Sequence, residues 1–498
     1  MRRRYTLFDH DLTPGKEHGL LLGFIVLVSV SIYILTSWLY YRVGFPLDDS
    51  WIHQTYARNL AMYGEWSFLP GQPSAGSTAP LWTALLTPGH LFGLGPFIWT
   101  YLLSGFLLLF LAIVVENTMR TWMTNYTHRF PWVGFVIVLE WHLVWATCSG
   151  METLLFTLLA TLILVRIILR TKNDLSLGLL IGLCSWVRPD GLTLLGPAIL
   201  AVVIRDATGT QLIRNLLKLA IGVGGLFALY ILFNLILGGT PFPNTYYAKQ
   251  IEYSVYLQTP FIQRIGLQIL QPLVGVGIVI VPGYIYALAT SIKQRNWGIL
   301  IASVWLLGYL GIYAWRLPVL YQHGRYAMPV IPLILIIGIA GVILIKERLH
   351  TRAGKLITSG WQVAISSILI IFWLRGAYAY AQDVAVIESE MVTVAKWVSD
   401  NIPEGSLVAA HDIGALGYFG RREIVDLAGL ISPAVIQFLR DERQLAEYLN
   451  KTEVNYLISF PDWYPSLTAG LESIFTSEGQ YAPLFGEQNM VVYRWVYP

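Results

Sequence analysis

Long apolar runs separated by short polar segments dominate residues 19–380. The first run, residues 19–43, holds one charge, Arg42, near its end. With about 25 residues it is long enough to cross about 30 Å of hydrocarbon with some tilt. Because it has no small-residue cleavage site, we interpret it as an uncleaved first span and not as a signal peptide.

The positions of Lys and Arg predict how the apolar runs cross the membrane, because short cytoplasmic loops are enriched in both residues. Basic clusters occupy residues 2–4, 120–129, 170–172, 205–218, 293–295 and 346–355. Their alternation with the apolar runs predicts eleven spans: 19–43, 97–119, 131–147, 153–170, 176–187, 191–204, 216–238, 266–291, 297–315, 327–346 and 361–380. The N-terminus is then cytoplasmic and the C-terminus extracytoplasmic. The short apolar stretch 80–94 is expected to lie as a helix at the outer interface.

Composition supports a polytopic α-helical membrane protein. Hydrophobic residues make up 55% of the 498 residues and charged residues only 13%, which excludes an ordinary soluble protein and a disordered one. From residue 383 onward, 16 acidic residues face 7 basic ones, so a basic membrane part precedes an acidic tail. The two cysteines have no zinc or disulfide spacing.

The tail, residues 385–498, is expected to form a soluble extracytoplasmic α/β domain, and residues 1–384 the membrane module. Alternating patterns predict helices at 389–401, 433–439 and 444–450, and strands at 407–410, 423–427, 454–460 and 490–493. This domain contains no glycine-rich phosphate loop and no nucleophile elbow. A rigid outer lid or a docking module is therefore its first interpretation.

Charged residues gather on the predicted outer side. The outer segments are the long loop 44–96 and the shorter segments 149–152, 188–191, 239–249 and 316–326. These segments are rich in Pro, Gly, Tyr and Trp and contain few charged residues. The charges are too few to serve general solvation, so each is expected to have a specific role. Two of these charges, Asp48 and Asp49, are adjacent and too costly to bury in lipid. They are expected at a water-facing surface above the helices.

The first outer loop contains two distinctive motifs, residues 46–60 (PLDDSWIHQTYARNL) and 76–82 (GSTAPLW). They resemble the first outer loop of GT-C membrane glycosyltransferases, and are closest to bacterial enzymes that use polyprenyl-phosphate sugars, of the arabinofuranosyltransferase and protein mannosyltransferase-like kind. The tail segments 410–419 (AHDIGALGYF) and 426–430 (DLAGL) resemble the outer domain of many bacterial members. The resemblance implies a catalytic acidic residue in the first outer loop and a further acidic residue in the second. Asp48 or Asp49, and Glu152, occupy the matching places.

Acid–base chemistry gives the acidic pair a role. A sugar leaving a lipid phosphate needs cations at the phosphate oxygens and a base at the acceptor hydroxyl. Asp49 or Asp48 is the candidate base, with Asp49 slightly favoured. A structural alternative is that either residue caps the helix that follows. Glu152 would bind acceptor hydroxyls, or else cap the helix that begins at residue 153.

Arg325 is the first candidate for binding the donor phosphate, because a guanidinium can form two parallel hydrogen bonds to phosphate oxygens. His323 could add a donor beside it, and Lys249 and Arg188 are second choices. The alternatives are a head-group anchor for Arg325 and a salt bridge to Asp190 for Arg188.

Two further ionisable residues, Glu140 and His142, lie in or near a span. They could line the cavity or form a buried hydrogen-bonded pair.

The sequence therefore predicts a glycosyltransferase of the cytoplasmic membrane that moves a sugar from a polyprenyl phosphate to a hydroxyl of a glycan, lipid or protein on the outer face. The protein is expected to contact membrane lipids. It is not expected to bind nucleic acid or to need a cofactor. A divalent cation is not required by these carboxylates. The alternatives are a transporter or flippase of lipid-linked sugars, and a non-catalytic envelope-assembly subunit.

Overall fold

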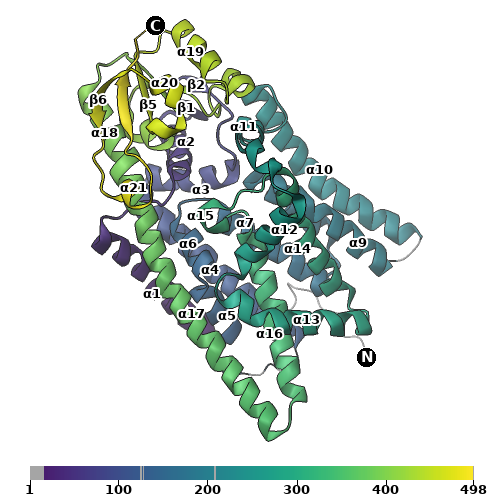
Figure 1. Cartoon of the computed structure of the whole chain (residues 1–498). Helices are drawn as coiled ribbons and strands as arrows, with labels where there is room; N and C mark the ends of the chain where they lie inside the picture. The colour runs from purple at the N-terminus through teal and green to yellow at the C-terminus, as the bar shows by residue number, and fades with distance from the viewer. Residues whose placement is uncertain (1–15, 124–125, 127, 207–208, 497–498) are drawn as a thin grey trace.

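The structure is a computed structural model that describes residues 16–123, 126, 128–206 and 209–496. Helices make up most of it, and a small α/β domain covers one end of the helical part (Figure 1). The chain is therefore a polytopic helical membrane protein with a C-terminal α/β domain, as the sequence predicts. The basic segment 2–4, expected on the cytoplasmic side, lies outside the described residues.

Within the described residues, seven helices are long and apolar enough to cross a membrane. They are α1 (Lys16–Tyr40), α4 (Gly95–Trp122), α10 (Thr210–Gly238), α13 (Val276–Gln294), α14 (Trp297–Arg316), α16 (Ile331–Arg348) and α17 (Arg352–Ile387). Shorter helices pack among them: α5 (Trp132–Leu139), α6 (Trp141–Cys148), α7 (Thr153–Ile168), α8 (Asp174–Val187) and α9 (Leu195–Asp206). The helices fall on the predicted apolar runs, while the count of eleven spans stays a prediction.

Two predicted spans, 131–147 and 266–291, are broken helices in the structure. Glu140 lies between α5 and α6, and its carboxylate caps the start of α6. The second run divides into α12 (Phe261–Leu270) and α13, with Gly275 at the break in a backbone conformation (φ 101°) that glycine adopts readily. Both runs stay largely apolar through the break, so hydropathy alone merges the two pieces.

The first outer loop folds into short elements beneath the C-terminal domain (Figure 1). They are α2 (Asp48–Tyr63), the antiparallel pair β1 (Ser67–Leu69) and β2 (Gln72–Pro73), and α3 (Pro80–Leu91), the helix predicted at 80–94. Two more short helices, α11 (Asn244–Glu252) and α15 (Tyr321–Gly324), come from later loops. These elements supply most of the polar residues discussed below.

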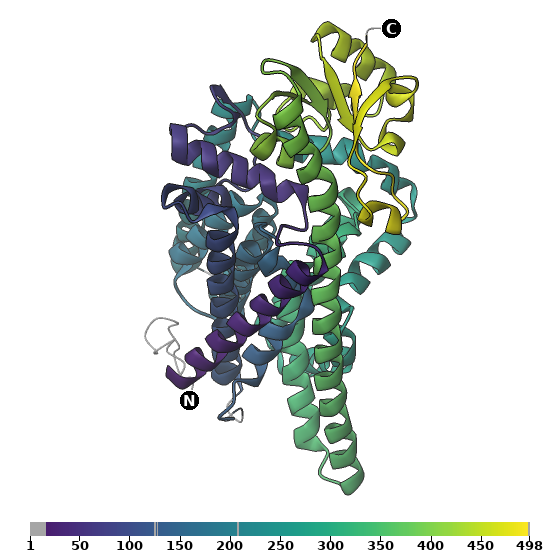
Figure 2. The same ribbon diagram turned by 90° about the vertical axis from the view of Figure 1, so that its left-hand side faces the viewer.

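The last long helix joins the helical part to the C-terminal domain without a linker (Figure 2). α17 continues through a π-helical turn, Glu388–Val392, into α18 (Thr393–Asn401). The helix predicted at 389–401 is thus the end of this longer helix, and the predicted domain boundary after residue 384 falls inside α17. A continuous helix transmits orientation better than a flexible loop, so the domain is held firmly over the bundle.

The C-terminal domain is built on a sheet whose described strands have the order β4-β3-β5-β7-β6. The strands are β3 (Leu407–Ala410), β4 (Glu423–Asp426), β5 (Tyr456–Ser459), β6 (Glu472–Thr476) and β7 (Val491–Arg494). The helices are α19 (Glu442–Lys451), α20 (Pro465–Thr468) and α21 (Tyr481–Leu484), and Pro433–Phe438 is a 3₁₀ turn where a helix was predicted. β3 pairs in parallel with β4 and β5, while β7 runs antiparallel to β5 and β6. β6 was not predicted, because this edge strand lacks a buried apolar face.

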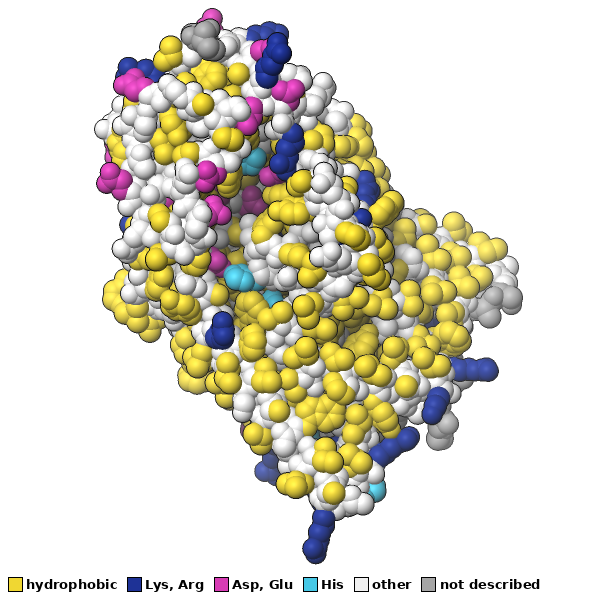
Figure 3. Space-filling view, viewed as in Figure 1, with side chains coloured by type: hydrophobic (Ala, Val, Ile, Leu, Met, Phe, Trp, Pro, Cys, Tyr) yellow, Lys and Arg dark blue, Asp and Glu magenta, His cyan; other side chains and the backbone are white. Residues whose placement is uncertain are grey.

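Charge is distributed unevenly along the molecule. In Figure 3, acidic side chains gather on the upper part, around the C-terminal domain, whereas Lys and Arg predominate at the lower end. Hydrophobic side chains cover the surface between them. This polarity agrees with a cytoplasmic lower end, while the orientation in the membrane stays a prediction.

Glycines bring two pairs of helices into backbone contact. A Cβ added at Gly341 of α16 would lie 1.8 Å from the carbonyl oxygen of Gly283 in α13. A Cβ added at Gly222 of α10 would lie 2.6 Å from the carbonyl oxygen of Leu175 in α8. Small residues allow this close approach of helices in membranes. These contacts fix the packing of α13 against α16 and of α8 against α10.

Gly341→Ala is expected to lower the melting temperature of the detergent-solubilised protein. The added methyl group must push α16 away from α13, and overpacking of this kind costs about 1–3 kcal/mol. Gly311→Ala in α14 is the matched control, since a Cβ there meets no atom of the described residues within 4 Å. Equal melting temperatures for the two variants would contradict the proposed backbone contact.

Candidate functional site

A cavity of about 310 Å³ lies where the helical part meets the C-terminal domain. Each of the predicted outer segments contributes to its wall, and Leu430 of the C-terminal domain completes it. Five of the predicted site residues line the cavity: Asp49, Glu152, Arg188, Lys249 and Arg325. The other two, Asp48 and His323, lie outside the lining.

Asp49 is the point where the acidic and basic residues of the cavity meet. One carboxylate oxygen, Oδ2, accepts a hydrogen bond from Nη2 of Arg325 at 2.7 Å and lies 3.4 Å from Nζ of Lys249. The hydroxyl of Tyr326 lies 3.1 Å from the same Arg325 nitrogen and 3.3 Å from Lys249 Nζ. The Asp49 side chain is 30% exposed, whereas that of Arg325 is 4% exposed. The acid is therefore reachable from the cavity and the guanidinium is held behind it.

The charges around Asp49 decide its protonation. Burial alone would raise its pKa, but the nearby charges of Lys249 and Arg325 lower that pKa below its ordinary value. Burial would lower the pKa of Lys249, and the Asp49 carboxylate raises it instead. Both groups are therefore charged over the neutral range, and Asp49 is a weak base while it is paired to the two cations.

Asp48 has a different environment from its neighbour. Its oxygens accept hydrogen bonds from the backbone N–H groups of Gly414 (2.7 Å) and Ala415 (2.8 Å), at the start of the helical segment 414–420 that follows β3. Burial raises the pKa of Asp48 to about 6, with the two N–H donors acting against that rise. The capping alternative is wrong: the N-cap position is Leu47, and no described side chain caps α2.

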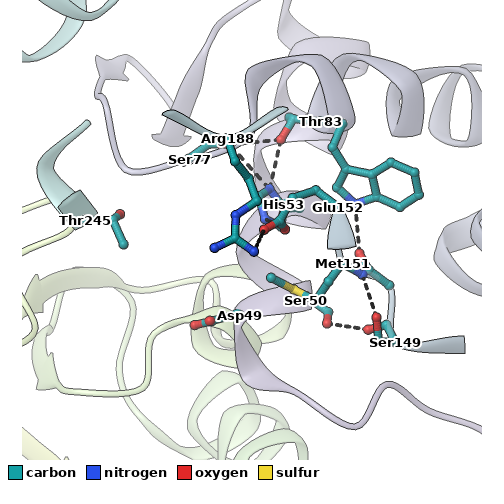
Figure 4. A network of polar contacts seen from close by, with 12 residues as sticks. Asp49, Ser50, His53, Ser77, Thr83, Ser149, Met151, Glu152, Arg188 and Thr245 are labelled. Carbon is teal, nitrogen blue, oxygen red and sulfur yellow. Dashed lines mark hydrogen bonds and ion pairs between the residues drawn. The ribbon is translucent and has the colours of Figure 1, made fainter. Parts of the chain in front are cut away.

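Glu152 lies at the start of α7 and faces two partners across the cavity wall. Its Oε2 lies 3.5 Å from Nε2 of His53, and its Oε1 lies 3.9 Å from Nη1 of Arg188. It occupies the N-cap position of α7, yet among the described residues its side chain makes no capping hydrogen bond. Its carboxylate is therefore directed to the cavity network shown in Figure 4.

His53 is a residue of this site that sequence reasoning missed. Its Nδ1 lies 3.0 Å from Oγ1 of Thr83 and 3.3 Å from Oγ of Ser77, and its Nε2 faces Glu152 (Figure 4). The signal was present, because His53 follows Asp49 by four residues and so shares its face of α2. The ring is 2% exposed, and its hydroxyl partners orient it toward Glu152.

Arg188 forms the salt bridge to Asp190 that is the predicted alternative to phosphate binding. Its Nη2 lies 3.0 Å from Oδ2 of Asp190 and 2.7 Å from the hydroxyl of Tyr313. The guanidinium also lies over the rings of Phe156 and Tyr326. These contacts surround a buried side chain, so Arg188 links the Glu152 side of the cavity to the Arg325 side.

His323 points away from the cavity despite its place two residues before Arg325. Its Nε2 lies 2.8 Å from Oδ2 of Asp383 in α17, which also accepts from the indole N–H of Trp145. Gln322 and His323 adopt left-handed backbone angles (φ 56° and 55°), and this turn separates the direction of His323 from that of Arg325. The predicted pairing of the two side chains is not present.

Glu140 and His142 also lie apart from the cavity lining. His142 Nδ1 is 2.7 Å from Oε1 of Glu140, and both side chains are almost fully buried. They form the hydrogen-bonded pair that was one of the two predicted alternatives.

No three His, Cys, Asp or Glu side chains of the described residues are grouped so that they could hold a metal ion. The expectation that no cofactor is needed stays a prediction.

Comparison with solved structures identifies the fold. The Archaeoglobus fulgidus oligosaccharyltransferase, in its apo form, has a TM-score of 0.61 and 12% identity over 90% of this chain and 70% of that chain. ArnT from Cupriavidus metallidurans bound to undecaprenyl phosphate has a TM-score of 0.58 and 14% identity over 94% and 97%. The apo state of ArnT from Cupriavidus metallidurans has a TM-score of 0.56 and 14% identity, over 97% of this chain and 99% of that chain. Both proteins are GT-C membrane glycosyltransferases, so this chain has the GT-C fold.

Sequence comparison adds one finding. Residues 377–493 match a domain of unknown function, DUF8728, which corresponds to the end of α17 and the C-terminal domain. Comparison with curated protein sequences finds no match.

Arg188→Met is expected to destabilise the protein by about 3–5 kcal/mol, because it leaves the buried carboxylate of Glu152 and the partly buried carboxylate of Asp190 without their cation. Thermal unfolding of the purified protein measures the effect. Arg443→Met is the control, since Arg443 pairs with Glu447 on an exposed helix surface and such pairs contribute about 0.3–0.5 kcal/mol. A melting temperature for Arg188→Met as high as that of the control would contradict a structural role for Arg188.

Proposed function

We propose that this protein is a membrane glycosyltransferase. It takes a sugar from a polyprenyl phosphate and attaches it to a hydroxyl of a glycan, lipid or protein on the outer face of the cytoplasmic membrane. One observation carries the proposal: in a GT-C fold, Asp49 meets Arg325 and Lys249 in one cavity. The ArnT structure with this fold binds undecaprenyl phosphate, and a sugar donor built on such a lipid phosphate is the type that the two cations suit.

Arg325 and Lys249 are the proposed phosphate ligands. The sugar leaves from its anomeric carbon while negative charge grows on the phosphate oxygen, and fixed cations stabilise that charge. Within the described residues, the buried Nη1 of Arg325 has no hydrogen-bond partner, so it is available for a phosphate oxygen. A guanidinium with a free N–H and a neighbouring ammonium suit a phosphate better than either group alone.

Asp49 is the proposed base. The same two cations that would bind phosphate hold its pKa low in this structure. Phosphate competes for them, and a carboxylate released from its cations regains basicity. The donor would thereby separate Asp49 from Arg325 and place the sugar between the base and the phosphate. Asp49 then takes the proton of the acceptor hydroxyl as that oxygen attacks the anomeric carbon.

Glu152 is proposed to orient the acceptor. It lies on the cavity wall with His53 on one side and Arg188 on the other. The nearest described partner of its buried Oε2 is Nε2 of His53 at 3.5 Å, and a carboxylate oxygen has lone pairs left to accept a hydrogen bond from an acceptor hydroxyl. Attack from the Asp49 side opposite the departing phosphate inverts the configuration at the anomeric carbon.

Asp49→Asn is expected to reduce sugar transfer by about 100-fold to 10,000-fold, the usual contribution of a general base. The assay supplies a panel of undecaprenyl-phosphate-linked monosaccharides to the protein in lipid vesicles. Mass spectrometry then measures free undecaprenyl phosphate and glycosylated product. The control is Asp400→Asn, which removes the charge of an exposed aspartate on α18 and is expected to transfer at the wild-type rate.

Full transfer by Asp49→Asn would refute the assignment of the base. Movement of the labelled donor across the vesicle membrane without a covalent product would instead support a transporter or flippase.

Lys249→Met is expected to move the acid limb of the pH profile to higher pH. Lys249 lowers the pKa of Asp49 in the folded protein, so its loss raises that pKa and protonates the base at a pH where the wild type is ionised. The rate loss should therefore be larger at about pH 5 than at about pH 8. The measurement is kcat/KM against pH for wild type, Lys249→Met and the exposed control Lys451→Met. A limb that stays in place or moves to lower pH would contradict the pairing.

A further inference from the structure

The C-terminal domain holds the helix that carries Asp49. At the first turn of α2, both carboxylate oxygens of Asp48 accept backbone N–H groups, from Gly414 and from Ala415. Near the other end of α2, the guanidinium of Arg58 donates to the carbonyl oxygens of Tyr418 (2.7 Å) and Gly417 (3.2 Å). Five consecutive residues of the domain, 414–418, therefore span the helix from its first turn to its third.

The contact at Asp48 leaves no room for a side chain on the domain. A Cβ added at Gly414 would lie 2.0 Å from the backbone oxygen of Asp48 and 2.8 Å from its Oδ2. Asp48 itself is 8% exposed. The first turn of α2 and the start of the helical segment 414–420 are thus in contact at backbone distance, and movement of one displaces the other.

The same domain also holds both ends of α11, the helix that carries Lys249. At the first residue of α11, Nδ2 of Asn244 donates to the carbonyl oxygen of Leu430 (3.0 Å). At its last residue, Oε1 of Glu252 lies 3.3 Å from Nε2 of His411. The ring of His411 is held in turn by the hydroxyl of Tyr464, 2.6 Å from Nδ1. One domain therefore contacts both the acid-bearing helix and the cation-bearing helix.

We propose that the C-terminal domain, which matches a domain of unknown function, is the positioning element of the reacting centre. It sets the distance between Asp49 on α2 and Lys249 on α11, with Gly414 and Ala415 as positioning residues that act through Asp48. Asp48 is thereby a structural ligand of the domain, and Asp49 is the residue that faces the substrate. The predicted effect on sugar transfer rests on the proposed function. The predicted effect on the mobility of α2 and α11 rests on the geometry alone.

The first test compares Gly414→Ala with Gly420→Ala. A Cβ at Gly420 has only ordinary contacts, the nearest at 3.4 Å from a Leu416 methyl carbon, so this variant changes the same domain without touching α2. Gly414→Ala is expected to lower kcat by about 100-fold, as for a displaced catalytic group. KM for the undecaprenyl-phosphate-linked donor should stay within about threefold, since both cations remain. Gly420→Ala should keep the wild-type kcat.

The second variant, Asp48→Asn, guards against a folding defect in Gly414→Ala. Its amide offers one acceptor oxygen in place of two, so one N–H bond to the domain is lost while the shape is kept. It should lower kcat in the same direction by a smaller factor. A wild-type kcat in both Gly414→Ala and Asp48→Asn, or a decrease that Gly420→Ala shares, overturns the proposal.

Hydrogen–deuterium exchange decides the structural part without any sugar transfer. Gly414→Ala is expected to speed exchange of backbone amides in α2 and α11, and to leave α13 and α16 as in Gly420→Ala. If neither the wild-type protein nor any variant transfers sugar, the proposed function fails. Faster exchange of α2 and α11 in Gly414→Ala would still support the positioning role. Unchanged exchange in both helices overturns the positioning role, whatever the activity.

Discussion

The contact of Asp49 with Arg325 and Lys249 draws three distant segments of the chain to one point. Asp49 and its two partners stand 276 and 200 positions apart along the chain, yet they meet within 3.4 Å. An ionised carboxylate among apolar helices is costly unless cations compensate it. The three elements that carry these residues are therefore tied to one point, and the cavity forms around that point.

Two consecutive aspartates serve two different surfaces because they lie on different sides of one helix. Successive residues of an α-helix point about 100° apart, so Asp48 faces the C-terminal domain while Asp49 faces the cavity. A single acidic residue could not both anchor the domain and remain reachable from the cavity. The pair thus links the C-terminal domain to the cavity, and the continuous helix from α17 to α18 keeps that domain over the site.

Much of the candidate site was predictable because charge is scarce in this chain. In apolar sequence each charged residue requires a reason, and positive-inside counting assigned Asp49, Glu152, Arg188, Lys249 and Arg325 to one side. The failures have local causes. His323 was assigned by its nearness to Arg325, but a left-handed turn points the two apart. His53 carries no acidic signal of its own, and only its position on the same helix face as Asp49 indicates a place in the site.

Hydropathy and charge along the chain are sufficient to predict a helical membrane protein with an acidic α/β domain at its C-terminus, because both act on each segment separately. They also determine which residues are too costly to place in lipid. Only the tertiary structure decided which of them meet, that helices break at Glu140 and Gly275, and which aspartate faces the cavity. Those outcomes depend on contacts between segments hundreds of residues apart and on the direction of each side chain, which a linear pattern does not contain.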